Sequence, residues 1–135
     1  MRLYPIVVAG ALILFGMAWY QARVKPEDIP GTYRAEYRFG IDEVQLNKDH
    51  SYVQRIRLVG EDAMVEQRGR WSYNPNSGYV RIEDAFVIVD GFGNPEPNFR
   101  SAPLGATLRP VWRIFHFGSL NMGTTEIVPY RKLAQ

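Results

Sequence analysis

The chain has 135 residues and no cysteine, so one domain with its own core is expected, and disulfides, thiolate nucleophiles and thiolate-bound zinc are excluded. Its formal net charge is +2, from 16 basic and 14 acidic residues. A nucleic-acid partner is not expected, because binding a polyanion requires a clear excess of basic residues on one surface.

The N-terminal segment predicts an apolar helix that is either a membrane anchor or a signal segment. Every position from Leu3 to Tyr20 is uncharged, and as a helix this stretch would be about 27 Å long, close to the roughly 30 Å of a bilayer core. Gly16 and Ala18 suit a signal peptidase, so a cleaved secretory leader is the alternative. Trp19 and Tyr20 favour the uncleaved anchor, because aromatic residues suit the membrane interface.

These features divide the chain into an anchor or signal segment at 1–22, a linker at 23–30 and an antiparallel β domain at 31–133. Pro26 and Pro30 make the linker an extended tether rather than a helix. We expect a single-pass membrane protein with its β domain in the periplasm or extracellular space, or a secreted protein if the leader is cleaved. Few basic residues flank the apolar segment on either side, so charge specifies this orientation only weakly.

Residues 31–89 alternate apolar and charged side chains at every second position, which is typical of antiparallel strands with one dry and one wet face. Strands are expected at 31–39, 42–46, 51–59, 63–73 and 80–89. The expected inward residues are Tyr33, Ala35, Tyr37, Phe39, Val44, Leu46, Tyr52, Ile56, Leu58, Val65, Gly69, Trp71, Tyr73, Val80 and Ile82. Arginines and glutamates fill the other face, where they favour solubility and correct register. His50 occupies a turn position that often requires a positive φ.

Periodicity disappears from Asp90 to Gly105, where glycine and proline dominate. A long connection of this kind is usually a binding loop, a lid or disorder. Phe92 and Phe99 lie in it beside Arg100, with no obvious core to join, so we expect them to contact a partner or ligand. With Trp112 of the next strand, these residues are the candidate binding site.

The sheet is expected to resume at 108–117, in a strand that is apolar on both sides, and to close with a strand at 124–130 after a turn at 118–123. The fold class is therefore mainly β. We expect an antiparallel small barrel or bent meander sheet of about seven strands, preceded by the apolar helix.

Several short motifs resemble small bacterial extracytoplasmic domains of lipocalin-like, or calycin-like, build. They are GTYRAEY at Gly31–Tyr37, the strand at Asp42–Leu46 with the Asx-rich turn after it, SY at 51–52 and GRWSY at 69–73. The resemblance covers about residues 31–89. It implies an antiparallel barrel or half barrel, and a carrier of a small apolar ligand is among the functions it implies.

No metal site or cofactor is expected. His50 and His116 are the histidines of the chain, and without cysteine a metal would need carboxylates at suitable spacing around them. No such spacing occurs.

Catalysis is not expected either. The adjacent acidic residues Glu83 and Asp84 lie on a predicted strand, where neighbours point to opposite faces and cannot flank one bond. No serine sits in a nucleophile elbow, and no glycine-rich phosphate loop leads into a helix. A hydrolase with a site that the sequence does not reveal is kept as a third hypothesis.

The sequence therefore favours a non-catalytic, membrane-tethered extracytoplasmic β domain that binds a protein or envelope partner. A lipocalin-like carrier of a small apolar ligand is the alternative.

Overall fold

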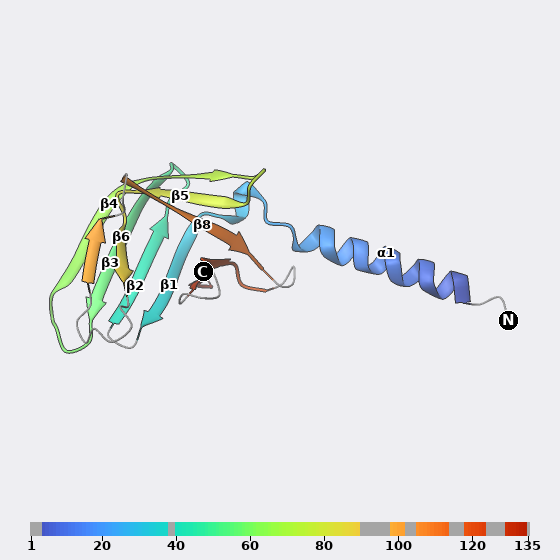
Figure 1. Ribbon diagram of the computed structural model, residues 1–135, viewed down its shortest axis with the longest axis horizontal. Helices are drawn as coiled ribbons and strands as arrows, with labels where there is room; N and C mark the ends of the chain where they lie inside the picture. Colours follow the sequence, from blue (N-terminus) through green and yellow to red (C-terminus); the bar gives the residue numbers. More distant parts are fainter. Residues whose placement is uncertain are drawn as a thin grey trace.

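Eight antiparallel strands close into a barrel, and an N-terminal helix extends away from it (Figure 1). The computed structural model describes residues 4–37, 40–89, 98–101, 105–113, 118–123 and 129–134. The helical elements are α1, Tyr4–Ala22, and the short 3-10 helix η1, Pro26–Asp28. The strands are β1 Gly31–Tyr37, β2 Gly40–Leu46, β3 Ser51–Leu58, β4 Met64–Asn74, β5 Tyr79–Glu83, β6 Phe86–Val89, β7 Asn98–Ser101, β8 Ala106–Trp112, β9 Asn121–Met122 and β10 Tyr130–Lys132.

The barrel order is β1-β10-β9-β8-β5-β4-β3-β2, and β6 and β7 form a separate two-stranded sheet. The mainly β, antiparallel class predicted from sequence is confirmed, but the expected count of about seven strands is wrong. Strand β9 accounts for the eighth strand of the barrel, because it has only 2 residues and lies in a segment assigned to a turn. The segment expected to be one strand at 80–89 is two strands in different sheets, of which only β5 belongs to the barrel.

The predicted alternation places the core correctly along β1 to β5. Most of the expected inward residues are buried, and Tyr37 and Tyr73 pack against them partly buried. The buried members of that set are Tyr33, Ala35, Val44, Leu46, Tyr52, Ile56, Trp71, Val80 and Ile82. The outer face carries arginine–glutamate ion pairs, among them Arg34 with Glu43 and Arg55 with Glu66. Period-two burial thus builds this wall of the barrel.

The turn between β2 and β3 also forms as expected. His50 has a φ of 66°, and its ring lies 4.9 Å from that of Trp71, centroid to centroid. The Trp71 indole Nε1 donates to the Asn47 carbonyl at 2.9 Å. The turn is therefore held against the barrel wall by a core side chain.

The predicted strand at 80–89 breaks at Asp84, which has a φ of 54°. Its backbone N–H donates to the Gly105 carbonyl at 2.7 Å, so the chain leaves the barrel there and β6 pairs with β7 instead. The connection expected to lack structure from Asp90 to Gly105 accordingly contains a strand. Residues 90–97 and 102–104 lie outside the described residues.

The sequence predicts that the strand at 108–117 is apolar on both sides, but strand β8 is not. Leu108 is 66% exposed, whereas Arg109 lies opposite the buried Val80 and so faces the interior. The rest of that predicted strand, 114–117, lies outside the described residues. Of the expected closing strand at 124–130, residues 124–128 lie outside the described residues, and β10 begins at Tyr130.

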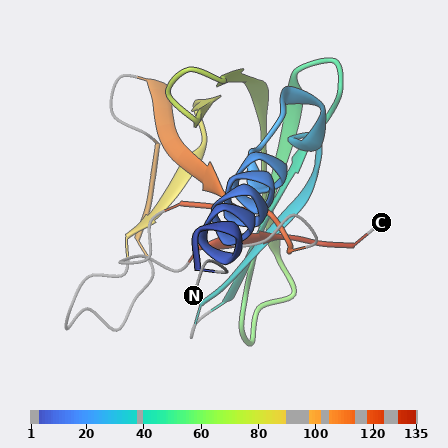
Figure 2. The ribbon, with the colours of Figure 1, turned by 90° about the vertical axis from the view of Figure 1, so that its right-hand side faces the viewer.

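Helix α1 projects from one end of the barrel (Figure 1), and Figure 2 looks along it onto that end. Its described large apolar side chains are 55% to 70% exposed. The predicted N-terminal helix is therefore confirmed. The predicted membrane span is not: in the part of the chain that the structure describes, no helix is long and apolar enough to cross a membrane.

Candidate functional site

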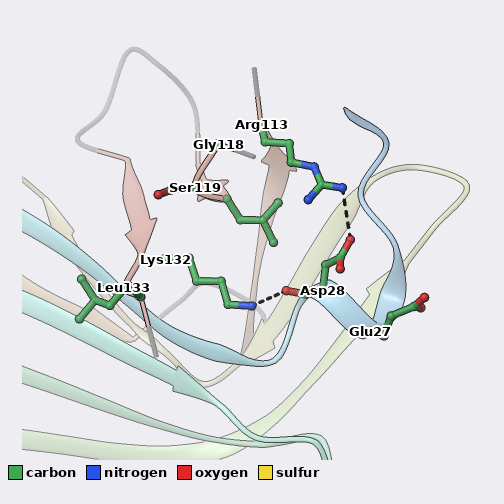
Figure 3. Close-up of a pocket in the computed structure, with 9 residues that line it drawn as sticks. Glu27, Asp28, Arg113, Gly118, Ser119, Lys132 and Leu133 are labelled. Atoms are coloured by element: carbon green, nitrogen blue, oxygen red, sulfur yellow. Dashed lines mark hydrogen bonds and ion pairs between the residues drawn. The ribbon is translucent and has the colours of Figure 1, made fainter. Parts of the chain in front are cut away.

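The end of the barrel beside α1 carries an open polar pocket of about 350 Å³ (Figure 3). The linker after α1, the end of β8 and strand β10 meet there. The lining residues of the pocket include Asp28, Arg113 and Lys132. The pocket therefore joins segments that are distant in sequence at the point where the helix leaves the barrel.

Two cations of this pocket converge on Asp28. The Arg113 side chain is only 9% exposed and lies 3.4 Å from the Asp28 carboxylate, and its Nη2 also donates to the Arg23 carbonyl at 2.8 Å. The Lys132 Nζ donates to the Asp28 carbonyl at 2.5 Å (Figure 3). Burial lowers the pKa of Lys132. We term Asp28, Arg113 and Lys132 the linker clamp, because both cations bind the linker.

Helix η1 closes the same end of the barrel. Ile29, directly after it, is fully buried and accepts a hydrogen bond at 2.6 Å from the Tyr33 hydroxyl. Burial, together with the negative charge of Asp28, raises the pKa of Tyr33. The linker predicted to be an extended tether thus contains one helical turn that is packed into the barrel.

A second set of polar groups lies inside the barrel, where Asp42, Gln54 and Tyr130 are each buried. The Tyr130 hydroxyl donates to Asp42 Oδ2 at 2.5 Å, and Gln54 Nε2 donates to the two carboxylate oxygens at 3.0 and 3.2 Å. The Arg109 guanidinium stacks on the Tyr130 ring, 4.6 Å from its centroid. We term these four residues the interior polar cluster.

Burial raises the pKa of Asp42 to about 6, although hydrogen bonds from Tyr130 and Gln54 and the charge of Arg109 act in the opposite direction. Gln54 also bonds both backbone groups of Phe86, accepting from its N–H at 2.8 Å and donating to its carbonyl at 3.0 Å. The cluster therefore attaches β6 to the barrel interior.

Sequence reasoning missed this cluster. Asp42 has the same parity as the inward Val44 and Leu46, and Gln54 has the same parity as Tyr52 and Ile56. A strict period-two reading would have placed both polar residues in the core.

The predicted binding residues are not brought together among the described residues. Phe92 lies outside them. Phe99 and Arg100 belong to β7, where their backbones pair with Ile88 and Val87. Trp112 ends β8, which pairs with β5 and β9, and its Nε1 donates to a backbone carbonyl of the same wall.

The described residues also offer no metal site, since no group of three or more potential ligands occurs among them. His50 lies in the β2–β3 turn, and His116 falls outside the described part of the chain. The cations of the linker clamp bind the linker, and the interior polar cluster binds β6. Both sets of polar residues are therefore suited to holding these segments against the barrel.

Comparison with known proteins adds no relative. No family model matches the chain, and neither a curated protein sequence nor a solved structure does. The resemblance to lipocalin-like domains stays a prediction.

Proposed function

We propose that this chain is a non-catalytic β-barrel domain held at a membrane by α1, with the barrel outside the cytoplasm, where it binds a protein or another envelope component. The observation that carries the proposal is the exposure of the apolar surface of α1. Its exposed large apolar residues are Ile6, Val7, Val8, Leu12, Ile13, Leu14, Phe15 and Met17.

These residues cover the whole circumference of the helix, because successive positions are about 100° apart. A helix that is apolar all round is normally covered by protein or by lipid. In Figure 1 the barrel does not cover α1. No helix among the described residues is long and apolar enough to cross a membrane, so the proposal rests on this uncovered apolar surface and not on a membrane span. We therefore infer that lipid covers α1.

The linker clamp supports the same proposal. Arg113 and Lys132 hold the linker to the barrel directly after α1, so the barrel is attached through fixed contacts rather than through a long flexible segment. On this proposal the barrel end that carries α1 faces the membrane, and the β3–β4 turn lies at the opposite end of the barrel (Figure 1).

Flotation of the full chain with liposomes tests the tether. The wild-type chain should rise with the vesicles, while a Leu12→Asp, Leu14→Asp double variant should stay in the dense fraction, since a charge within the hydrocarbon is costly. A Val59→Asp, Leu108→Asp variant is the matched control. It replaces apolar residues that are as exposed, at 74% and 66%, but lie on the barrel, and it should float. Equal flotation of both double variants would refute the proposal.

The closed barrel also keeps the carrier function as a second candidate, because closed β barrels can enclose one small ligand. The large side chains of Tyr33, Tyr52 and Tyr130, which are fully buried, weigh against it. Solvent extraction and mass spectrometry of the purified full chain decide between the two. A stoichiometric apolar molecule would support the carrier, and an empty extract would support the binding domain.

A further inference from the structure

The outer wall of β2, β3 and β4 sets an arginine between two apolar side chains. The strand register pairs Ile41 with Arg57 and Arg57 with Met64, so the three form one row across the wall. Ile41 is 39% exposed and Met64 is 45% exposed, and Arg57 is exposed between them. Apolar surface thus lies on both sides of this cation, whereas the next row of the wall is charged.

The carboxylates of the next row are already paired. Glu43 binds Arg34 at 3.0 Å. Glu66 binds Arg55 at 3.1 Å and a second arginine, Arg68, at 2.6 Å. This row therefore has no carboxylate left to neutralise a further cation.

Arg57 has no ion-pair partner among the described residues, since no carboxylate in that part of the chain lies within 4.0 Å of its guanidinium. Glu36 faces the same side of the wall, but it lies across Ile41 on β1. Within the described part of the chain, the positive charge of Arg57 is thus not compensated by a carboxylate.

A groove of about 180 Å³ lies over this row. It is lined by Arg34, Ile41, Glu43, Arg55, Arg57 and Met64, and we term it the Arg57 groove. A groove of this size suits a small group such as a carboxylate with a few carbons, and any longer chain would extend outside.

We propose that the Arg57 groove binds a small amphiphilic carboxylate, with the carboxylate on the Arg57 guanidinium and a short alkyl chain across Ile41 and Met64. The planar guanidinium matches a carboxylate through two parallel hydrogen bonds. One free cation suits a monoanion, because the neighbouring arginines are paired with glutamates. The site lies on the barrel wall and does not depend on the membrane tether.

Methyl NMR of the full chain in detergent micelles tests the site, with hexanoate as the probe. Saturable shifts are expected at the Ile41 and Met64 methyl groups. Hexanol, which lacks the charge, and acetate, which lacks the chain, should each give much weaker effects. Equal shifts with hexanol, or tighter binding of hexyl phosphate, would overturn the assignment.

Arg57→Gln should weaken hexanoate binding by about tenfold or more, because the charge-assisted hydrogen bonds are lost. Arg81→Gln is the matched control, as an exposed arginine on the outer wall of β5, and it should bind as the wild type does. Met64→Glu, which adds a carboxylate beside Arg57, should also abolish binding. Unchanged affinity in Arg57→Gln would refute the site, whereas the Leu12→Asp, Leu14→Asp variant should keep it even if the tether proposal fails.

Discussion

Asp42 couples the stability of this fold to pH. Its carboxylate is fully buried inside the barrel, and burial raises its pKa to about 6 from the ordinary 3.8. Between these two values the folded chain holds the proton and the unfolded chain does not. The free energy of unfolding therefore falls as pH rises through this window, and above about pH 6 the loss is complete.

Asp42→Asn should remove this pH dependence. Relative to wild type, the variant should gain up to about 3 kcal/mol in free energy of unfolding between pH 4 and pH 7, since each pKa unit corresponds to about 1.4 kcal/mol. Denaturant titrations at intervals across that range measure the difference. Parallel stability curves for the two proteins would contradict a raised pKa at this position.

A sequence can reveal the position of Asp42 but not its environment. Its parity with Val44 places it inward, but an acidic residue next to Glu43 would normally be expected on the solvent-exposed face. The partners that make its burial tolerable come from β3 and β10, 12 and 88 residues away along the chain. Alternation along one strand carries no information about such contacts.

At the scale of elements, Gly69 determines how β4 meets the interior. A Cβ at this position would lie 2.8 Å from Tyr52 Cε1 and 3.0 Å from the Glu83 carbonyl. Tyr52 passes over the glycine and donates to that same carbonyl at 2.5 Å. The missing side chain therefore allows β3 to bond to the end of β5, beside the point where the chain leaves the barrel.

Gly69→Ala should lower the free energy of unfolding by about 1 to 3 kcal/mol, because the added methyl group overpacks this contact. Gly10→Ala is the control, since a Cβ there meets nothing within 4 Å. Thermal unfolding of the two variants provides the comparison. Equal midpoints would show that Tyr52 can move aside without cost.

The elements themselves could be predicted where a strand has one wet face and one dry face, as β1 to β5 do. Prediction fails where that contrast ends. The apolar run at 85–89 gives no sign that Asp84 turns the chain out of the barrel, and the 2-residue strand β9 is too short to show any period. Most of the predicted binding loop lies outside the described residues, so Phe92, Phe99 and Arg100 stay predicted binding residues.

At the scale of the whole molecule, the linker clamp determines whether helix and barrel move together. Arg113→Gln should loosen the attachment, because the side chain then loses its charge on Asp28 and part of its bond to Arg23. The absence of cysteine allows spin labels at Leu14→Cys and Val59→Cys in liposomes. The distance distribution should broaden in Arg113→Gln and stay narrow in the control Arg81→Gln. A broad distance distribution in the labelled chain without either substitution would show that the linker clamp does not fix the helix to the barrel.

The attachment of the barrel to α1 also determines how far Arg57 lies from the linker end of the barrel. Strand β3 has 8 residues and starts near the linker end, so Arg57 lies about 20 Å along that strand at roughly 3.3 Å per residue, and a shorter distance along the barrel axis because barrel strands are tilted. If α1 lies in lipid, this guanidinium is held on the part of the barrel wall away from the linker end. A molecule captured there would have to arrive from solution, and lateral diffusion of the anchored chain would then carry it along the surface.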